Sequence, residues 1–198
     1  MSHLFGILFS PRSAWESIRD VDGFILITYL KFAIPIALLP VLAWYYGYVQ
    51  IGWEFGDRVI RLTSTSANQI MSLFYLAMLI GTGLLGFMVH WMSEIYEASP
   101  STYSKGVRIA AYTLAPLFVC GATGLYSVLW LDILLGCAAA GYAVYLLYIG
   151  VPIVMRVPAE RGFLFASAMV AVGLVGCAAM LGATVILWEM GAMPVFKD

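Results

Sequence analysis

Runs of apolar residues long enough to cross a lipid bilayer recur five times along this chain and constrain its fold more than any other feature. A membrane-spanning helix needs about 20 mostly apolar residues. The runs cover residues 23–49, 70–92, 107–126, 127–155 and 163–188. Because hydrocarbon offers no hydrogen-bond partner to backbone groups, such runs must be helical. The sequence therefore predicts an all-α integral membrane bundle of five transmembrane helices.

The third and fourth runs are adjacent, so their separation needs its own argument. One helix over residues 107–155 would be roughly 72 Å long at about 1.5 Å per residue, more than twice the thickness of the hydrocarbon layer. The segment GATGLYS, residues 121–127, consists of small and turn-prone residues. We therefore expect a tight hairpin there and two separate spans.

The composition excludes a water-soluble domain. Hydrophobic residues make up 63% of the chain and charged residues 11%, against about 45–50% and about 25% in soluble domains. The net charge is −1 and the basic residues are scattered, which excludes a basic patch for nucleic acid. The lipid bilayer is the expected partner, and residues 1–198 are predicted to form a single membrane domain.

The distribution of Lys and Arg predicts the orientation of the chain. With the N-terminus inside, six basic residues lie on the inner side, namely Arg12, Arg19, Lys105, Arg108, Arg156 and Arg161. Three lie on the outer side, namely Arg58, Arg61 and Lys197. The positive-inside rule then favours a cytoplasmic N-terminus and a C-terminus outside.

The segment before the first span is predicted to form a short amphipathic helix over residues 10–21. Ser10 can cap this helix, and Pro11 suits its first position, where no amide donor is needed. Trp15 and Ile18 fall on its apolar face, opposite most of its charged residues. We expect Pro11, Trp15 and Ile18 to anchor the helix in the inner headgroup layer, with Trp15 tying it to the bundle.

Ionisable residues in or near the spans are the candidate functional groups. His90, Glu94 and Glu97 follow one another at spacings of four and three, which places them on one helix face at the end of the second span. An imidazole and two carboxylates could bind a divalent metal ion or relay protons. The alternative is a packed histidine beside two solvated interface carboxylates.

Two further ionisable residues lie within the apolar runs. Lys31 is close enough to the inner end of the first span to extend its ammonium group to the interface. Asp132 lies just beyond the predicted hairpin, where we expect its carboxylate to reach water.

Small residues are concentrated in residues 81–86, 136–141 and 172–183. Small residues spaced four apart let two helix backbones approach closely, either within one chain or between two copies. We favour packing within one protomer. Prolines inside the spans, at positions 35, 40, 116 and 152, are expected to bend their helices.

Catalytic motifs are missing from the chain. HExxH, GxSxG and a glycine-rich phosphate loop with a lysine are all absent. GTGLLG, residues 81–86, has the letters of a dinucleotide-binding motif but lies inside a span without a preceding strand. The sequence therefore predicts no enzymatic activity and no cofactor.

Three stretches together resemble the Yip-domain family, the Ypt/Rab-interacting membrane proteins, and in particular its compact bacterial inner-membrane members. They are LFSPRSAWESI (residues 8–18), AYTLAPLF (residues 111–118) and YAVYLLYIGVPIVM (residues 142–155). The resemblance implies a five-helix bundle with a cytoplasmic N-terminus in the bacterial cytoplasmic membrane. Eukaryotic members resemble adaptors with long hydrophilic N-terminal regions, whereas only about twenty residues precede the first span here, so GTPase binding is not expected.

The leading hypothesis is a non-enzymatic membrane organiser or scaffold that acts through lipid or protein contacts. Its protein partner would be another membrane protein or a second copy of this chain. The alternative is a small transporter or channel for a cation or proton, using the face formed by His90, Glu94 and Glu97.

Overall fold

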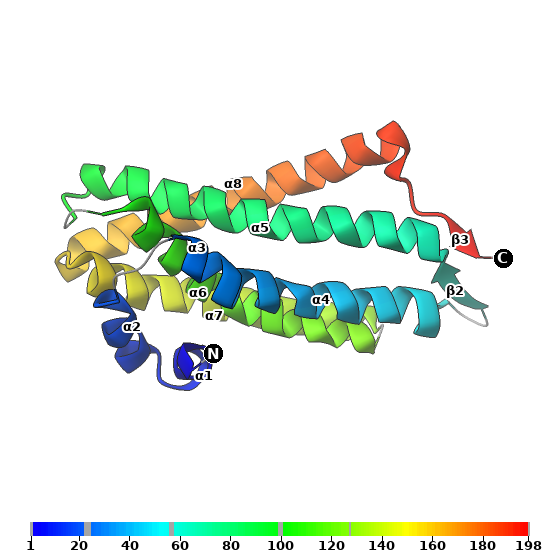
Figure 1. The fold of residues 1–198 in the computed structure, drawn as a ribbon, viewed down its shortest axis with the longest axis horizontal. Helices are drawn as coiled ribbons and strands as arrows, with labels where there is room; N and C mark the ends of the chain where they lie inside the picture. The colour runs from blue at the N-terminus through cyan, green and yellow to red at the C-terminus, as the bar shows by residue number, and fades with distance from the viewer. Residues whose placement is uncertain (1, 22–24, 56–57, 99–100, 127, 198) are drawn as a thin grey trace.

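The computed structural model describes residues 2–21, 25–55, 58–98, 101–126 and 128–197. Five long helical segments lie along one another in an elongated bundle (Figure 1). In order, the elements are α1 (Ser2–Phe9), α2 (Pro11–Arg19), α3 (Ile25–Thr28), η1 (Tyr29–Ala33), α4 (Ile34–Tyr46), η2 (Gly47–Ile51), β1 (Trp53–Phe55), β2 (Arg58–Leu62), α5 (Ser64–Ile95), α6 (Tyr103–Cys120), η3 (Gly121–Leu125), α7 (Leu129–Met155), α8 (Ala159–Leu187), η4 (Trp188–Ala192) and β3 (Phe196–Lys197).

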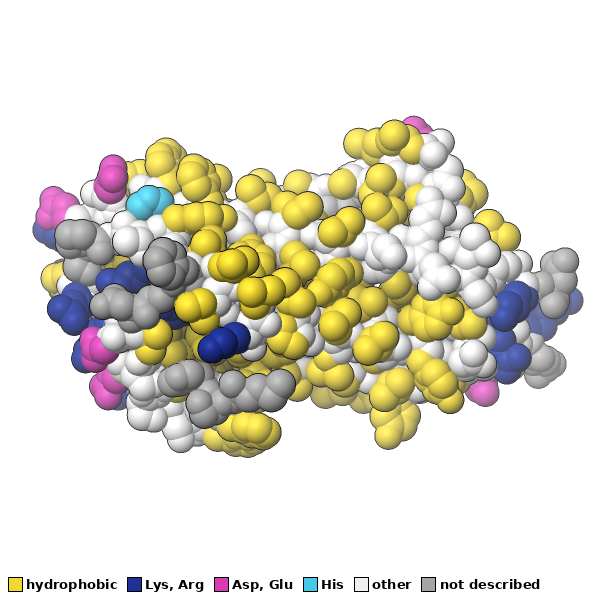
Figure 2. Space-filling view, in the orientation of Figure 1, with side chains coloured by type: hydrophobic (Ala, Val, Ile, Leu, Met, Phe, Trp, Pro, Cys, Tyr) yellow, Lys and Arg dark blue, Asp and Glu magenta, His cyan; other side chains and the backbone are white. Residues whose placement is uncertain are grey.

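Five segments are long and apolar enough to cross a membrane, which confirms the predicted all-α bundle. They are Ile25–Ile51, Ser64–Ile95, Tyr103–Leu125, Leu129–Met155 and Ala159–Ala192. Hydrophobic side chains cover the middle of the molecule, and charged side chains gather mainly at its two ends (Figure 2). The predicted starts of the first and fourth spans, Gly23 and Ser127, lie outside the described residues.

The first span is irregular, as its prolines predict. It is assembled from α3, η1, α4 and η2, in which η1 and η2 are π-helical. Pro35 can neither donate a backbone hydrogen bond nor tolerate the carbonyl of Lys31 one turn earlier. The π-helical turn η1 contains Lys31 and widens the helix at this point.

Two glycines bring α5 and α6 into close contact. A Cβ atom on Gly86 would lie 2.5 Å from the Cα of Val107, and one on Gly106 would overlap the carbonyl oxygen of Gly86. The backbones therefore touch directly, as the small residues of 81–86 predict for packing within one chain.

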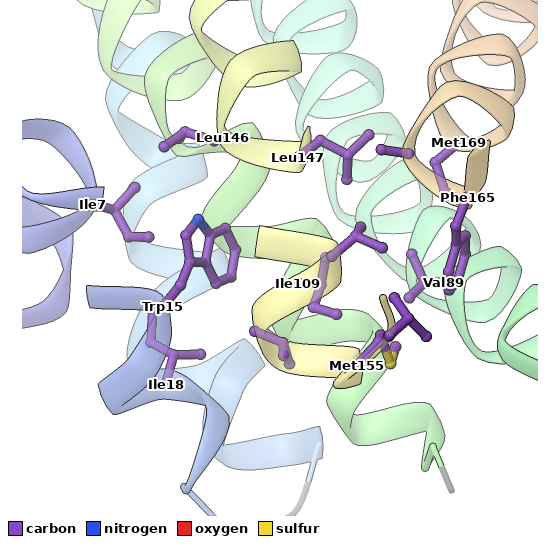
Figure 3. Packing of buried hydrophobic residues seen from close by; sticks show 14 of the residues in the cluster. Ile7, Trp15, Ile18, Val89, Ile109, Leu146, Leu147, Met155, Phe165 and Met169 are labelled. Atoms are coloured by element: carbon purple, nitrogen blue, oxygen red, sulfur yellow. The ribbon is translucent and has the colours of Figure 1, made fainter. Parts of the chain in front are cut away.

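The largest apolar core lies where α2 meets the bundle, and we call this end of the molecule the α2 end. Side chains from six helices meet there (Figure 3), including Ile7, Trp15, Ile18, Val89, Ile109, Leu146, Val151, Met155, Phe165 and Met169. A second cluster around Phe32 and Phe118 joins α4, α5 and α6 further along the bundle.

At the opposite end, a small sheet that the sequence analysis did not anticipate joins three short strands, and we call this end the sheet end. β2 pairs antiparallel with β1 and with β3, and Arg61 is the cross-strand partner of Lys197. The Thr63 amide donates to the Val195 carbonyl at 2.9 Å. The C-terminal strand is thereby fastened to the start of α5.

The second half of α8 diverges from the other spans before η4 and β3 return to the sheet end (Figure 1). Added Cβ atoms on Gly173, Gly176 and Gly182 of α8 would meet no described residue within 4 Å, and the same is true of Gly136 and Gly141 of α7. The expectation that these small residues pack within one protomer is therefore wrong for these five glycines, although it is right for Gly86.

Candidate functional site: a docked N-terminal hairpin and a lateral cleft

The first two helices form a hairpin that docks on α7 through Trp15. The Trp15 side chain is fully buried, and its ring lies against Gly150, where an added Cβ would be 2.5 Å from Cε2. Ile18 is buried beside it. Trp15 thus ties α2 to the bundle, and the amphipathic helix is present, but its apolar face is covered by protein. A headgroup-layer anchor formed by Pro11, Trp15 and Ile18 stays a prediction.

The start of α2 agrees only in part with the prediction from the sequence. Pro11 occupies its first turn, as predicted, and Ser10 is the N-cap residue. The Ser10 side chain makes no capping hydrogen bond. The Ser10 carbonyl instead accepts from the Ala14 amide at 3.1 Å and the Ser13 hydroxyl at 3.0 Å.

Tyr142 secures the other helix of the hairpin. Its hydroxyl lies 2.9 Å from the Leu8 carbonyl and 3.2 Å from the Ile7 carbonyl, two of the last carbonyls of α1. The last carbonyls of a helix have no partner within that helix. Because Tyr142 stands at the midpoint of α7, α1 reaches far along the bundle instead of ending at its edge. Because Ile7 and Tyr142 are 135 residues apart, no local pattern in the sequence indicates this contact.

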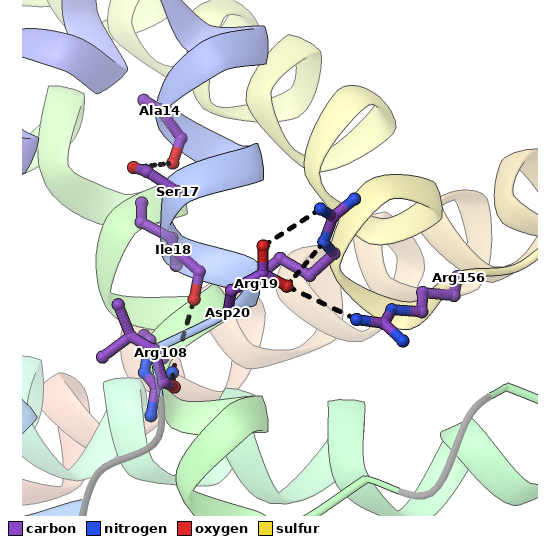
Figure 4. Close-up of polar contacts among 8 residues, drawn as sticks. Ala14, Ser17, Ile18, Arg19, Asp20, Arg108 and Arg156 are labelled. Atoms are coloured by element: carbon purple, nitrogen blue, oxygen red, sulfur yellow. Dashed lines mark hydrogen bonds and ion pairs between the residues drawn. The ribbon is translucent and has the colours of Figure 1, made fainter.

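Arg108 of α6 holds the other end of α2. Its side chain is buried, and Nη1 donates to the carbonyls of Val21 and, at 3.4 Å, of Ile18 (Figure 4). A cation at a helix C-terminus also interacts favourably with the helix dipole. In the sequence, Arg108 is recognisable only as one of the six inner basic residues, because Ile18 and Val21 lie about 90 residues away.

Asp20 links α2 to α7 by an ion pair at the surface. Its carboxylate accepts from Arg19 at 2.9 and 3.0 Å and from Arg156 at 3.4 Å (Figure 4). The hydrogen bonds from Arg19, assisted by the charge of Arg156, lower the pKa of the Asp20 carboxyl. All three side chains are substantially exposed, so the network fixes geometry more than it stabilises the fold.

The structure does not bring His90, Glu94 and Glu97 together. α5 ends at Ile95, and Glu97 has a φ of 50°, so it turns away from the helix and pairs with Arg161 of α8. Glu94 is exposed, whereas Nδ1 of His90 is buried and has no hydrogen-bond partner among the described residues. Across the described ranges, no three His, Cys, Asp or Glu residues form a group that could hold a metal ion. The three side chains could share one helix face only if α5 continued past residue 97.

The remaining ionisable candidates lie far apart in the fold. Lys31 is exposed on the π-helical turn η1 of the first span. Asp132 lies in the first turn of α7, and both of its carboxylate oxygens are shielded and have no hydrogen-bond partner in the part of the chain that the structure describes. The expectation that Asp132 reaches water is therefore wrong.

A cleft of about 420 Å³ lies where α8 diverges, and we call it the lateral cleft. Its lining comes from α4, α5, α8, η2 and η4: Trp44, Tyr48, Ile70, Met71, Leu73, Phe74, Ala77, Met180, Ala183, Thr184, Leu187, Trp188 and Ala192. The hydroxyl of Thr184 donates to the Met180 carbonyl at 2.9 Å, so the walls are almost wholly apolar. Phe74, Met180 and Trp188 are each about 40% exposed (37%, 41% and 42%), because the cleft opens sideways at the bundle surface.

Comparison with known proteins places this architecture in a family. The model of the Yip1 domain matches residues 5–180. The chain belongs to the Yip1-domain family. The match therefore includes α2 and most of α1, together with Arg108 and Tyr142, and it ends within α8, before Thr184 and Trp188 of the lateral cleft.

Curated relatives of this Yip1-domain chain are similar over almost their whole length. "Inner membrane protein YohC" of Escherichia coli strain K12 is 34% identical over 192 residues, covering 96% of this chain and 98% of the relative. The protein of the same name from Escherichia coli O6:H1 shows the same identity and coverage. No solved structure matches this Yip1-domain chain.

Proposed function

We propose that this chain is a multispanning protein of the bacterial inner membrane that organises its surroundings through lipid contacts, without chemistry of its own. The relatives named as inner membrane proteins cover nearly the whole chain, which supports the location. Five apolar spans support residence within the bilayer.

The observation that carries this proposal is the apolar lining of the lateral cleft. A pathway for protons or cations needs polar groups or water along its length. Neither Lys31 nor His90 belongs to the cleft lining, and the aromatic and aliphatic walls offer a surface that resembles lipid chains. A cleft open to the side is accessible to lipid from within the membrane.

Hydrogen bonds across helix contacts also support a static bundle. The Tyr29 hydroxyl donates to the Leu79 carbonyl at 3.0 Å, and the Tyr103 hydroxyl donates to the Gly83 carbonyl at 3.2 Å. These polar groups link one span to the next, so they serve packing within the membrane.

The test reconstitutes the purified full-length chain in vesicles and measures two properties at increasing protein density. We expect the diffusion and order of labelled lipids to change with protein density, while proton and divalent-cation flux stays at the level of empty vesicles. Flux that rises with protein density and falls on His90→Ala would overturn the proposal in favour of transport. Unchanged lipid diffusion and order at every density would also overturn it.

The proposed orientation has the N-terminus in the cytoplasm and the C-terminus outside, supported by the six-to-three distribution of basic residues. Its test uses a variant in which Cys120, Cys137 and Cys177 are replaced by serine. Single cysteines are then introduced by Arg58→Cys and Lys105→Cys. An impermeant thiol reagent added to intact spheroplasts should label only position 58, and labelling of position 105 alone would reverse the orientation.

A further inference from the structure

We infer that α1 inserts into the membrane and that its exposed residues Phe5 and Phe9 contact acyl chains in the leaflet at the α2 end. The inference rests on the proposed function and names a surface through which this chain contacts lipid. In this arrangement α2 lies nearer the headgroups of the same leaflet. Three observations support it: the depth of α1 along the bundle, the face that α1 leaves uncovered and the hydrogen bonds at its end.

Contacts with α7 place α1 deeper along the bundle than α2. Asp20, which follows α2, pairs with Arg156 just after the end of α7. Trp15 of α2 lies against Gly150, whereas the last carbonyls of α1 lie at Tyr142. At about 1.5 Å per residue, Tyr142 is about 12 Å beyond Gly150 and about 21 Å beyond Arg156. Figure 1 shows the same order, with α1 nearer the middle of the bundle than α2.

Contacts with α6 give the same order of depth. The carbonyls of Ile18 and Val21, at and just after the end of α2, accept from Arg108, which is the last charged residue of α6. Leu4 of α1 instead packs against the second apolar cluster, to which α6 contributes Ala111 and residues further along the span. Because Ala111 lies about 4.5 Å beyond Arg108, α1 lies beside the apolar part of α6.

Lys31 shows how deep α1 extends. Lys31 adjoins Phe32, a buried member of the same cluster, so it lies near the level of Leu4 on the first span. A lysine reaches the headgroups from the outer part of the acyl layer, along its apolar stem. α1 therefore lies in the outer part of that layer, as do amphipathic helices that bury their apolar face about 5–10 Å into the boundary between headgroups and acyl chains.

α1 turns two aromatic side chains away from the protein. Phe5 is 68% exposed and Phe9 is 80% exposed, and a spacing of four places both on one helix face. Ile7, on another face, is fully buried in the core at the α2 end. Residues 2–9 contain no Asp, Glu, Lys or Arg, and their two polar residues stand at the start. The uncovered face formed by the two phenylalanines is therefore apolar.

The hydrogen bonds at the end of α1 suit surroundings without water. The last carbonyls of a helix have no partner within that helix, and a missing partner is costly in hydrocarbon. The Tyr142 hydroxyl lies 2.9 Å from the Leu8 carbonyl and 3.2 Å from the Ile7 carbonyl. The Ser10 amide donates to the Gly6 carbonyl at 2.7 Å. Three of the last four carbonyls of α1 thus lie within hydrogen-bonding distance of a donor from the protein itself.

Acyl chains are the occupant that the surroundings of this face favour. The ring of Tyr145 lies 5.6 Å from that of Tyr142 between centroids, and Tyr145 is 49% exposed, so the outer surface of α7 continues onto α1. Transfer of both phenylalanine side chains from water to acyl chains is favourable, because it removes apolar surface from water. α2 instead exposes Arg12 and Glu16, and these charged side chains suit the headgroup layer.

The experiment measures the depth of spin labels in the bilayer. All three native cysteines are replaced by serine, and single cysteines are introduced by Phe5→Cys, Phe9→Cys or, on the exposed face of α2, Arg12→Cys. Each full-length chain is labelled, checked for an unchanged melting temperature and reconstituted in phosphatidylcholine vesicles. Power saturation then compares collisions with oxygen, which concentrates among acyl chains, and collisions with a nickel chelate that stays in water.

Two reference positions calibrate the measurement. Tyr145→Cys on the exposed surface of α7 represents the acyl layer, and Glu160→Cys in the first turn of α8 represents water. We expect the labels at positions 5 and 9 to match Tyr145→Cys. Their ratio of oxygen collisions to nickel collisions should be several-fold higher than that of Arg12→Cys or Glu160→Cys.

A double substitution tests whether lipid contact holds α1 in place. Phe5→Gln with Phe9→Gln makes the exposed face polar without removing a buried side chain. In vesicles, we expect hydrogen exchange in residues 2–9 to become several-fold faster, while the melting temperature of the bundle stays unchanged. Phe196→Gln, an equally polar change at an exposed position of the sheet end, is the matched control and should leave exchange in residues 2–9 unchanged.

Two results would overturn the inference. Nickel collisions at positions 5 and 9 as frequent as at position 12 would place α1 in the headgroup layer or in water. Few collisions with either reagent would show that protein, such as a second copy of the chain, covers Phe5 and Phe9. If either result is obtained while lipid diffusion still responds to protein density, the proposed function stands and only this surface is refuted. Deep labels without any response of lipid diffusion or order would refute the proposed function and leave the position of α1 intact.

Discussion

The indole of Trp15 lies against Gly150, and this contact joins the N-terminal hairpin to α7. We predict that Trp15→Ala lowers the free energy of unfolding by about 3–5 kcal/mol, because it leaves a large cavity in the core at the α2 end. Thermal unfolding in detergent measures the loss. A melting temperature equal to that of the unmodified chain would show that the hairpin does not depend on this contact.

Gly150→Ala tests the same contact from α7. A Cβ atom 2.5 Å from Cε2 of Trp15 forces the ring to move, so we expect a loss of about 1–3 kcal/mol. Gly141→Ala is the matched control on the same helix, where no atom of the described chain lies within 4 Å of the added atom. Because alanine favours helix over glycine, the control should keep or slightly raise the melting temperature. Equal effects of both substitutions would contradict the docking geometry.

The α5–α6 contact gives a second pair of glycine substitutions. In Gly106→Ala the new atom overlaps the Gly86 carbonyl, and because both groups belong to backbone, only separation of the helices relieves it. We expect a loss of at least about 1–3 kcal/mol, or failure to accumulate in the membrane. Gly81→Ala, whose added atom meets none of the residues that the structure describes within 4 Å, should accumulate normally. Membrane expression and the melting temperature are measured for both variants. A stable Gly106→Ala protein would refute the close approach of α5 and α6.

Arg108→Met should loosen α2 while the five spans remain assembled. The substitution leaves the carbonyls of Ile18 and Val21 without their donor, at a cost of about 1–3 kcal/mol. Hydrogen exchange should therefore quicken in residues 11–19 before it changes elsewhere. Arg12→Met, at an exposed position of α2, is the control. Uniform loss of protection throughout the chain would assign Arg108 to the general core instead.

How much of the fold and of the candidate site can be predicted from the sequence depends on how far apart the interacting residues lie along the chain. Apolar runs and the small residues of 121–127 predict the five spans and the α6–α7 hairpin, because both are local patterns. The docking of α1 depends on a hydroxyl of Tyr142 that is 135 residues from Ile7, and the pairing of Arg61 with Lys197 is equally non-local. Neither contact leaves a periodic signal in one sequence.

The residues of the predicted metal face, His90, Glu94 and Glu97, do not form a group in the described structure, and the reason is local. A helix that continued through Glu97 would have kept His90 and Glu94 beside it, but α5 ends at Ile95. Glu97 takes a left-handed conformation that residues other than glycine rarely adopt, and its ion pair with Arg161 accompanies this turn. No pattern around Glu97 indicates that conformation.

The ion pairs of Asp20 predict a pH dependence. Hydrogen bonds from Arg19 lower the pKa of Asp20 in the folded chain, so the unfolded chain takes up the proton at a higher pH. The contribution to stability is complete above about pH 4, the usual range of an aspartate, and is lost as the pH falls through the lowered pKa. The melting-temperature difference between the unmodified chain and Asp20→Asn should shrink below about pH 4. A difference that stays constant down to pH 3 would contradict this assignment.

The position of Tyr142 on α7 has a consequence for biogenesis. Ile7 and Trp15 leave the ribosome early, yet their binding surface on α7 is made about 135 residues later. At about 5–20 residues per second, the hairpin waits roughly 7–27 s before it can dock. During this interval its apolar side chains have only lipid, chaperone or insertion machinery to contact. The hairpin can therefore dock on α7 only after the fourth span has been made. A chain truncated before α7 would present an exposed N-terminal segment to the quality-control proteases of the membrane.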